Sequence, residues 1–409
     1  MTDDGRMRRV PVRLEGGRSY PIDVGPGVLS GLGAVARANL PAEARRVALV
    51  SNPRVFDLYG ARAIASLRGA GFSVSHWLMS DGERFKTLRT AERCLRFLSE
   101  SELERADAVA ALGGGVVGDL AGFAAALYLR GVAFVQVPTT LLAQIDSSVG
   151  GKTGVNTRAG KNLVGAFHQP RAVVVDTETL RTLPARELTA GWCEAIKQGA
   201  VGDRRLFERT RKFLEEESRR KVACRIGTGR DGSRAGVRGG GRDEGRGEGR
   251  DEELAELIAE QCAFKAKIVA GDEREDISRA DARSRRVLNF GHTVGHALES
   301  LTGYRRFRHG EAVGHGMIAA AEISKRLGLL DGSELESLRG AVRAAGHLPA
   351  ASDLDAGMVA RALRADKKAV GGSVRWVLLE RIGRARVVDG REVPARVIRE
   401  SIRAALGAR

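Results

Sequence analysis

Aromatic residues are scarce in this sequence, and their scarcity limits what the chain can bind. Phe, Trp and Tyr make up 5% of the 409 residues, too few for the stacking platforms on which single-stranded nucleic acids lie. The formal net charge of +16 suits nucleic acid, an acidic membrane or a small anionic substrate. Because the arginines are spread along the chain and do not form one stripe, we interpret the charge as composition that helps to steer small anions, without a nucleic-acid partner.

Long apolar runs and clustered cysteines are missing as well. The longest apolar run lies near residues 121–129, well short of the roughly 20 residues that a membrane-spanning helix requires. The first ten residues contain no apolar signal core, so nothing there marks the chain for export. The four cysteines show no paired metal spacing and are too few for a disulfide scaffold. We therefore expect a cytoplasmic protein without a membrane partner.

Short β-branched runs alternate with amphipathic segments over residues 1–185. The runs predicted as strands are Arg46–Ser51, Gly71–His76, Ala108–Leu112, Ala133–Val137 and Ala172–Asp176. This alternation predicts a Rossmann-like parallel sheet wound with helices, in which ligands lie beyond the carboxyl ends of the strands. Polar or glycine-rich segments fall at such ends: Asn52, Asp81–Lys86, Gly113–Asp119 and Thr139–Thr140.

Helical periodicity replaces this pattern after Leu183-Pro184, with few strands before Val374–Leu379. We therefore predict an α/β domain over residues 1–185 and an α-helical domain over residues 186–409.

A glycine- and arginine-rich insert at residues 226–250 interrupts the second domain. Arginine recurs there every four residues, but each glycine costs a helix about 1 kcal/mol, so we predict a disordered surface loop. An RNA-binding arginine–glycine segment is the alternative. The insert has no aromatic residue, and six arginines against four acidic residues leave it a charge of only +2.

Glycine turns are concentrated between Gly113 and Asn162. One turn, residues 113–119, follows an apolar strand, and two others precede Lys152 and Lys161. A strand, a glycine turn and a helix place backbone N–H groups against an anion, and a lysine adds a point charge for a phosphate. The set indicates a dinucleotide beside a phosphorylated substrate. Tight connections that need glycine only for their backbone angles are the alternative.

Four of the seven histidines lie between His292 and His315. On one helix starting near Arg285, a polar face spans about 80° at helical periodicity, with apolar residues opposite. The members of this face are Arg285, Asn289, His292, His296 and Glu299. Two imidazoles, an amide and a guanidinium are unusual on a solvated face, which is the alternative interpretation.

The spacing of His292 and His296 resembles that of a zinc helix but lacks the glutamate of the protease motif, so the two need not bind one ion. His309 offers another imidazole, and Glu194 offers a carboxylate at i, i+3 from Lys197. Two imidazoles and one carboxylate with open positions form a catalytic divalent-metal site, which polarises substrate hydroxyls. A surface ion pair between Glu194 and Lys197 is the alternative.

Several long motifs together resemble the 3-dehydroquinate synthase family over nearly the whole chain. They are GGGVVGDLAGFAAALYLRG, QVPTTLLAQIDSSVGGKTGVN, GKNLVGAFHQP, AGWCEAIK, LNFGHTVGHALE and HGEAV. The resemblance implies an NAD-binding α/β domain, an all-α metal- and substrate-binding domain, and a homodimer. It also implies a carbon–oxygen lyase of the shikimate pathway. That enzyme converts 3-deoxy-D-arabino-heptulosonate 7-phosphate to 3-dehydroquinate and phosphate by transient oxidation with NAD, elimination, reduction and aldol closure.

The resemblance also assigns roles to individual residues. It implies that Glu194, His292 and His309 bind the metal, with zinc or cobalt the usual ion. The positions matching NAD contacts are Asn52, Glu83, Lys86, Gly114, Gly115, Val116, Asp119, Thr139, Thr140, Asp146, Lys161 and Thr182. The positions matching catalytic and substrate-binding residues are Lys152, Asn162, Lys197, Lys265, Arg285, Asn289, His296 and Lys368, together with Arg130, which reaches the substrate phosphate of a neighbouring subunit. Lys367 is adjacent to Lys368, and the sequence leaves open which of them faces the substrate.

Besides the insert at residues 226–250, two features depart from the family pattern. Trp192-Cys193 replaces the small or aliphatic pair usual before the ligand glutamate, and the loop before Arg285 is longer than usual. Related sugar phosphate cyclases act on other ketoses or on glucose 6-phosphate, but the motifs at residues 150–152 and 291–296 favour 3-dehydroquinate synthase. Polyol dehydrogenases of the same superfamily usually bind their metal through an aspartate and histidines, whereas this sequence has Glu194.

Overall fold

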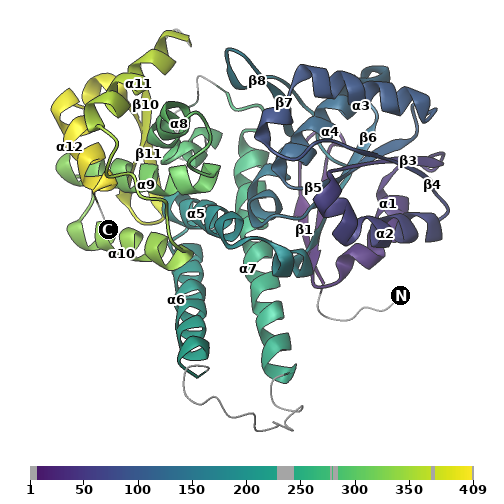
Figure 1. Ribbon diagram of the computed structural model, residues 1–409, viewed down its shortest axis with the longest axis horizontal. Helices are drawn as coiled ribbons and strands as arrows, with labels where there is room; N and C mark the ends of the chain where they lie inside the picture. The colour runs from purple at the N-terminus through teal and green to yellow at the C-terminus, as the bar shows by residue number, and fades with distance from the viewer. Residues whose placement is uncertain (1–6, 228–243, 277–278, 280–283, 370–373, 408–409) are drawn as a thin grey trace. The chain divides into compact units, whose positions relative to one another are not determined.

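The computed structural model describes residues 7–227, 244–276, 279, 284–369 and 374–407, without the side chains of residues 221–227, 244–248 and 364–369. The chain divides into two compact units (Figure 1). The first comprises Met1–Leu183 and Glu248–Arg274, and the second comprises Pro184–Gly247 and Glu275–Arg409.

The first unit is built on a seven-stranded sheet in the order β1-β2-β9-β6-β5-β3-β4. Its strands are β1 (Arg8–Val12), β2 (Tyr20–Gly25), β3 (Arg46–Ser51), β4 (Ser73–Leu78), β5 (Ala108–Gly113), β6 (Ala133–Pro138) and β9 (Ala172–Asp176). Every neighbouring pair is parallel except β1 with β2. The predicted parallel sheet is confirmed, and the predicted bounds of β3 and β9 agree with the structure to the residue.

The sequence analysis did not predict strands β1 and β2. Strand β1 contains Pro11, a residue depleted in strands, and proline is tolerated in β1 because this strand lies at the edge of the sheet. Val10 pairs with Ile22 and Val12 with Tyr20, and all four side chains are buried. Burial therefore stabilises these strands although their local sequence favours them weakly.

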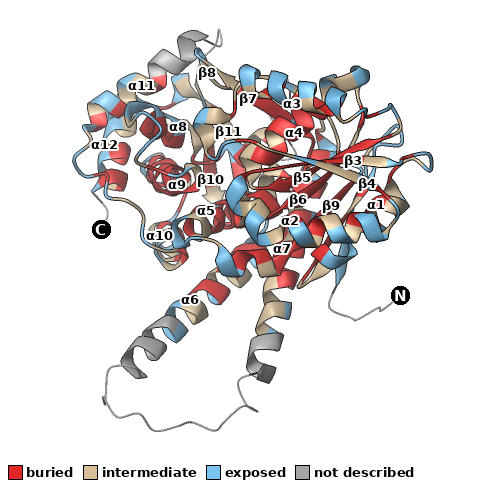
Figure 2. Ribbon diagram, turned by 45° about the vertical axis from the view of Figure 1, so that its right-hand side comes forward, coloured by how far each residue is buried: buried red, intermediate tan, exposed pale blue. Residues whose placement is uncertain are grey.

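Helices cover both faces of the sheet, whose strands are largely buried (Figure 2). The covering helices are α1 (Leu32–Asn39), α2 (Pro53–Gly69), α3 (Leu88–Glu100) and α4 (Gly115–Leu127). On β3, Val47 and Leu49 pack in the core beneath α1 and α2, whereas Ala48 and Val50 pack in the core beneath α3 and α4. This division follows from the alternation of side chains along a strand.

A side-chain cap begins helix α2 immediately after strand β3. The Asn52 side chain accepts a hydrogen bond from the Val55 N–H at 2.9 Å, and Pro53 occupies the first helical position. Asparagine is a preferred N-cap and proline a preferred first residue of a helix. The local sequence thus ends β3 and leaves Asn52 at the carboxyl end of the sheet, as predicted.

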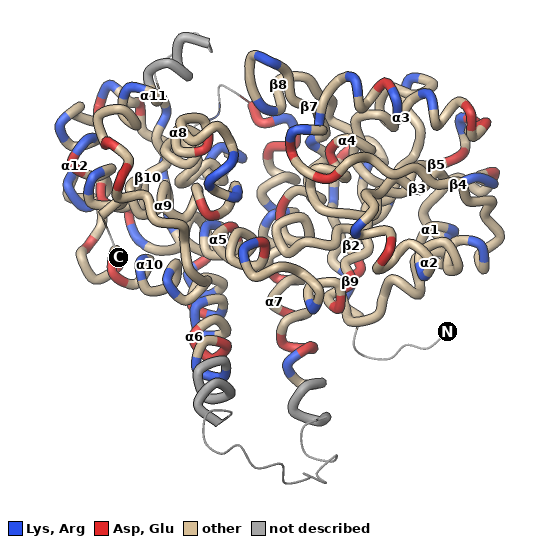
Figure 3. Tube along the Cα trace, viewed as in Figure 1, with Lys and Arg blue, Asp and Glu red and all other residues tan. Residues whose placement is uncertain are grey.

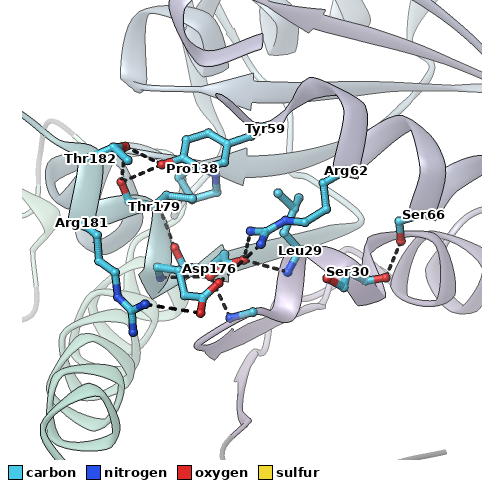
Figure 4. A network of polar contacts seen from close by, with 12 residues as sticks. Leu29, Ser30, Tyr59, Arg62, Ser66, Pro138, Asp176, Thr179, Arg181 and Thr182 are labelled. Carbon is cyan, nitrogen blue, oxygen red and sulfur yellow. Dashed lines mark hydrogen bonds and ion pairs between the residues drawn. The ribbon is translucent and has the colours of Figure 1, made fainter. Parts of the chain in front are cut away.

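Asp176, the last residue of β9, organises a polar network at this end of the strand (Figure 4). Its carboxylate accepts hydrogen bonds from the Gly27 N–H at 2.9 Å, the Leu29 N–H at 3.1 Å and the Arg62 guanidinium at 2.7 Å. Burial raises the pKa of Asp176, against the opposing effect of these donors. The network joins β9, α2 and the turn before α1, which are far apart in the sequence.

A β-hairpin carries the two lysines that the glycine turns were predicted to present. Strand β7 (Lys152–Thr157) pairs antiparallel with β8 (Gly160–Phe167). Lys152 and Lys161 each directly follow glycine, as predicted: Gly150 and Gly151, with φ 100° and 66°, precede Lys152, and Gly160 precedes Lys161. The chain continues after these glycines as a strand, whereas the turn at Gly113 leads into helix α4. Close packing requires a further glycine within the hairpin, because a Cβ on Gly165 would lie 2.2 Å from the Thr153 carbonyl oxygen.

Helix α7 (Glu244–Gly271) belongs largely to the first unit, because residues 248–274 group there. The Cys262 thiol donates to the Gln144 carbonyl oxygen at 3.2 Å, and Lys265 forms an ion pair with Asp146. The sequence analysis placed this segment in the second domain by its position in the chain. The correction has a physical reason: buried side chains of α7, Cys262 among them, pack within the first unit.

The prediction of a disordered loop over residues 226–250 is wrong at both ends of this range, which are helical. Residues 226–227 end helix α6 (Arg204–Gly227), and residues 244–250 begin α7. Extending an existing helix avoids the cost of nucleation, which outweighs the poor helix propensity of the glycines. Residues 228–243 lie outside the described residues.

The second unit is predominantly helical. Besides α6 it contains α5 (Ala185–Gly202), α8 (His292–Leu301), α9 (His309–Arg326), α10 (Gly332–Ala345), α11 (Ala356–Ala369) and α12 (Ala395–Leu406). It also contains a two-stranded antiparallel sheet of β10 (Arg375–Arg381) and β11 (Arg384–Asp389). The second unit is therefore not all-α, contrary to what the family resemblance had implied. Helix α9 is buried from Gly310 to Ser324 and packs against α5, α8 and α12.

Charged residues of both signs are interleaved on the helices (Figure 3). On α6, the Arg211 guanidinium lies 2.8 Å from Glu208 and 2.7 Å from Glu215. Such pairs at i, i+3 and i, i+4 stabilise an exposed helix modestly. Within the described part of the chain, none of the helices has the length and apolarity needed to cross a membrane.

The Asp176 network predicts a specific loss of stability. Asp176→Ala removes the acceptor of three backbone N–H groups, those of Gly27, Leu29 and Glu178, and of Arg62, and we expect the unfolding free energy of the first unit to fall by about 3 kcal/mol. Urea denaturation followed by circular dichroism measures the change. Asp57→Ala, an exposed position on α2, should change stability by less than about 0.5 kcal/mol. Equal effects of the two substitutions would contradict the assigned role.

Candidate active site

Three helices of the second unit bring Glu194, His292 and His309 together. Glu194 lies in the middle of α5, His292 is the first residue of α8, and His309 is the first residue of α9. Glu194 Oε1 lies 3.9 Å from His292 Nε2 and 3.6 Å from His309 Nε2. The sequence analysis required these side chains to converge, and they do.

Glycines permit this convergence because they let the helix backbones touch. A Cβ on Gly310 of α9 would lie 2.0 Å from the Ala190 carbonyl oxygen of α5, and one on Gly316 would lie 1.9 Å from the Gly291 carbonyl oxygen. No side chain fits at such separations, since interiors are close-packed. The backbone at Gly291 has φ 80°, a left-handed conformation that favours glycine.

The hydrogen bonds of the two rings direct the same nitrogen of each toward Glu194. His292 Nδ1 lies 3.2 Å from the Phe290 carbonyl oxygen, and His309 Nδ1 lies 3.1 Å from Glu299 Oε2. Both acceptors require a proton on Nδ1, which leaves the Nε2 lone pairs facing Glu194 Oε1. This arrangement is typical of metal-binding histidines, whose other nitrogen donates to a carbonyl or a carboxylate.

The Glu194 carboxylate is fully buried. Its Oε2 forms an ion pair with Lys197 Nζ, whereas Oε1 accepts no hydrogen bond from any residue that the structure describes. A buried carboxylate oxygen without a donor is costly, and a divalent cation would satisfy it. Because Lys197 is also buried, the alternative of a surface ion pair between the two residues is wrong.

The charges around the cluster act differently on the two rings. Burial, followed by the neighbouring Lys197 and the other histidines, lowers the pKa of His292 well below its ordinary value. Burial alone would lower the pKa of His309 as well, but the hydrogen bond that its ring donates to Glu299 and the charge of Glu194 raise it. The neutral imidazole is the form that binds a cation, and His292 is held in that form.

His296 lies beside this cluster and is exposed. One ligand atom from each of His292, His296 and His309 lies within 4.8 Å of the others, so the imidazole of His296 is a further donor. Glu194 Oε1 is the buried and unsatisfied atom of the group, and it is therefore the third ligand that fits best. That choice leaves His296 accessible for a proton-transfer role.

The predicted helix from Arg285 through His296 is not continuous. Residues 285–289 form a 3₁₀ turn, and α8 begins only at His292 after the left-handed Gly291. The prediction of one polar helical face is therefore wrong, because the sharp turn at Gly291 breaks the 3.6-residue period. Arg285 is buried. Asn289 is exposed, and its side-chain Nδ2 lies 3.5 Å from Glu275 Oε1.

In the first unit, strand β5, a glycine turn and helix α4 form the predicted anion-binding geometry. Strand β5 ends at Gly113, and Gly114 is the N-cap of α4. A Cβ on Gly114 would lie 3.0 Å from Thr140, on Gly115 2.8 Å from Ser147, and on Gly118 2.5 Å from Gln136. The glycines thus keep the helix N-terminus bare and close to the sheet, where its N–H groups attract an anion.

Lys86, Asp119 and Glu83 form a linked charge group at the same edge of the sheet. Lys86 Nζ lies 2.8 Å from Asp119 Oδ2 and 3.5 Å from Glu83 Oε1, and the Asn156 amide donates to Glu83 Oε1 at 2.7 Å. Burial raises the pKa of Asp119, and Lys86 opposes that shift. Burial would also raise the pKa of Glu83, but Lys86, Asn156 and Lys161 lower it overall.

The remaining predicted residues of the first unit fall into two groups. Asn52, Val116, Thr139 and Thr140 lie with the glycines at or just beyond the carboxyl ends of the strands, and exposed Thr182 lies 2.5 Å from the Tyr59 hydroxyl (Figure 4). Lys152, Lys161 and Asn162 lie on the β7–β8 hairpin, exposed Arg130 precedes β6, and Lys265 pairs with Asp146. The side chains of Lys367 and Lys368 lie outside the described residues.

Two supporting residues escaped the sequence analysis. Glu299 was placed on a polar face without a role, although it accepts from His309. Tyr20 was not singled out, and its hydroxyl accepts the Gly150 N–H at 3.1 Å, two residues before Lys152. Both contacts join segments that are distant in the sequence or separated by a turn, so local periodicity offered no signal for them.

Comparisons with known proteins identify the family. Residues 76–190 match the model described as 3-dehydroquinate synthase N-terminal, and residues 244–369 match 3-dehydroquinate synthase C-terminal. A 3-dehydroquinate synthase of Nostoc punctiforme is 42% identical, covering 94% of this chain and 96% of the relative. One from Pelotomaculum thermopropionicum is 46% identical, covering 94% of each chain. The chain belongs to the 3-dehydroquinate synthase family. The predicted family is confirmed.

Solved structures support the fold class. A 2-epi-5-epi-valiolone synthase from Streptomyces hygroscopicus, with NAD⁺ and Zn²⁺ bound, has a TM-score of 0.76 and 27% identity, covering 96% of this chain and 98% of the other. A 2-deoxy-scyllo-inosose synthase has a TM-score of 0.73 and 24% identity, covering 97% of this chain and 99% of the other. The second likeness shows the fold alone. Both agree with the predicted dehydroquinate synthase-like fold.

The contact between α8 and α9 predicts that Gly316 is essential to the cluster. Gly316→Ala would force these helices apart, and we expect a loss of about 2 kcal/mol in unfolding free energy together with weaker Zn²⁺ binding. Gly340→Ala on α10, where a Cβ meets nothing within 4 Å, should instead stabilise the protein by about 0.5 kcal/mol. Denaturation and zinc titration measure both effects. Wild-type zinc affinity in Gly316→Ala would contradict the assignment.

Proposed function

We propose that this chain is a carbon–oxygen lyase that converts 3-deoxy-D-arabino-heptulosonate 7-phosphate to 3-dehydroquinate and phosphate. Membership of the 3-dehydroquinate synthase family supports the proposal. The observation that carries it in this chain is the convergence of Glu194 Oε1 with the Nε2 atoms of His292 and His309. A buried carboxylate and two oriented imidazoles with open positions suit a catalytic divalent ion.

Glu194, His292 and His309 would hold the metal, zinc or cobalt. When bound, a divalent ion supplies Lewis-acid polarisation of substrate oxygens and stabilises developing negative charge. Lys197 keeps a positive charge beside Glu194 and would orient the anionic substrate. His296 is accessible beside the cluster, and imidazole is suited to moving a proton near neutral pH.

The glycine turn before α4 would hold NAD. When bound, the cofactor accepts a hydride from one substrate carbinol and returns it later, so the overall reaction consumes no NAD. The fit rests on this chain's own geometry, because side chains at Gly114, Gly115 or Gly118 would collide with neighbours. The N–H groups at the start of α4 would bind the pyrophosphate, while Lys86 would fix Asp119 and Glu83 beside it.

Cationic side chains would hold the substrate phosphate and carboxylate. Lys152 is exposed on β7, and buried Arg285 lies on the turn before α8. Lysine and arginine are the residues that bind such anions. Lys265, Asn162, Asn289 and Lys368 complete the proposed substrate residues by family resemblance.

The proposal includes a homodimer in which Arg130 serves the neighbouring subunit. Leu129 has φ 48° and Arg130 has φ 66°, a left-handed conformation unusual outside glycine. Strained backbone of this kind persists where function requires it, and Arg130 is exposed. A cytoplasmic location accompanies the pathway that we propose.

The proposed reaction predicts that phosphate release will occur without net reduction of NAD. Purified protein is incubated with the heptulosonate phosphate, NAD and zinc, while phosphate and absorbance at the nicotinamide band are followed together. Because the hydride returns to the substrate, we expect stoichiometric phosphate and no accumulating NADH. Lys152→Ala should lower kcat/KM by about tenfold or more, since a charge-assisted contact is lost.

Other outcomes of this assay would overturn the proposal in recognisable ways. Net NADH production would indicate a dehydrogenase. Phosphate release from glucose 6-phosphate or another ketose phosphate, but not from the heptulosonate phosphate, would indicate a different cyclase.

The glycine turn yields a separate prediction about NAD affinity. Gly118→Ala places a Cβ 2.5 Å from Oε1 of the buried Gln136, so the Gln136 side chain or the start of α4 must shift, and we expect NAD to bind about tenfold more weakly. Isothermal titration with NAD alone measures the change. Gly69→Ala on α2, where a Cβ meets nothing within 4 Å, is the matched control. Unchanged NAD affinity in Gly118→Ala would place the cofactor elsewhere.

A further inference from the structure

Glu299 is a buried carboxylate next to the candidate metal centre that the reaction itself does not use. It lies on α8, its side chain is 3% exposed, and Oε2 lies 3.1 Å from His309 Nδ1. A buried carboxylate is retained at a cost unless it is paired or hydrogen-bonded. The Glu299 carboxylate is hydrogen-bonded to His309, and this contact indicates its role.

Without a partner on Nδ1, the His309 ring would be loosely fixed. His309 is the first residue of α9, so less of the helix surrounds its side chain than would in the helix interior. The hydrogen bond to Glu299 fixes the ring orientation and keeps the proton on Nδ1. Nε2 then faces Glu194 Oε1 at 3.6 Å, the position from which both atoms reach one cation.

The two imidazoles of the cluster are held by acceptors of different kinds. His292 Nδ1 donates to the backbone carbonyl of Phe290, whereas His309 Nδ1 donates to a carboxylate. A carboxylate increases the basicity of the ring and its strength as a metal ligand more than a neutral carbonyl does. His309 therefore depends on a side chain that substitution can remove, while His292 does not.

We propose that Glu299 is a positioning residue that sets the metal affinity of the site by holding His309 with Nδ1 protonated and Nε2 aimed at Glu194. The proposal rests on the proposed function only in that the cluster binds a divalent cation. Glu299 would not contact the ion, because His309 lies between them. Its effect would appear in metal binding itself, before any substrate is added.

The test measures zinc binding by the full chain after its metal has been removed. Zn²⁺ is titrated in competition with a chromophoric chelator, and Co²⁺ is used for its visible absorption spectrum. Glu299→Met keeps the side-chain length and removes the acceptor, and we expect Zn²⁺ to bind about 10–100-fold more weakly. Glu299→Gln keeps an uncharged acceptor, so its loss should be smaller and its Co²⁺ spectrum closer to wild type.

A matched control separates this effect from the loss of a buried charge. Glu322 on α9 is also buried and forms ion pairs with Arg339 and Arg326. Glu322→Gln should leave the Zn²⁺ dissociation constant unchanged. NAD affinity and circular dichroism of each variant report whether the protein remains folded.

The proposal fails if Glu299→Met binds Zn²⁺ as tightly as wild type. Should the Met variant not fold, wild-type affinity and an unaltered Co²⁺ spectrum in Glu299→Gln would overturn it equally. Failure of the proposed function looks different. Wild-type protein that binds zinc but releases no phosphate from the heptulosonate phosphate refutes that function and leaves the role of Glu299 standing.

Discussion

Backbone contact between helices is the constraint on which the candidate metal centre depends. Helix α9 reaches α5 at Gly310 and the start of α8 at Gly316, where a Cβ would lie 2.0 Å and 1.9 Å from a carbonyl oxygen, far inside van der Waals contact. These contacts set the separation of Glu194, His292 and His309. The ligand side chains are short relative to the span between ordinary helices, which pack at about 8–10 Å, so small residues at the crossings are a condition for the site.

The second feature of the centre is how its charges balance. Glu194 is buried with Lys197 on one oxygen and an unsatisfied second oxygen, while burial and Lys197 favour neutral His292. A divalent ion would complete this arrangement, because it replaces the missing donor and needs neutral imidazoles. The first unit solves a comparable problem differently: Lys86 compensates Asp119 and Glu83 directly, leaving the N-terminus of α4 to attract an anion.

The sequence predicted the elements whose signals are local. Runs of β-branched residues predicted the central strands such as β3, and turn chemistry accounts for the Asn52 cap and the glycine turn at Gly113. The alternation of these strands with amphipathic segments predicted the fold class. The sequence analysis did not predict the turn at Gly291, so the helix was wrongly continued from Arg285 to His296. The association of residues 248–274 with the first unit depends on which surface α7 buries, and no pattern along one chain reports that. The convergence at Glu194 was predicted from residue types, whereas the contact of Glu299 with His309 required coordinates.

The discontinuity of the first unit has a consequence for biosynthesis. Its sheet is complete by Asp176, but the segment carrying Cys262 and Lys265 is translated only after the chain has passed through α5 and α6. As the polypeptide leaves the ribosome, the sheet of the first unit is therefore complete before helix α7 has been synthesised. Until α7 packs, the surface around Gln144 and Asp146 is open to water. The amino-terminal half can therefore reach its complete fold only late in elongation, when α7 packs against it.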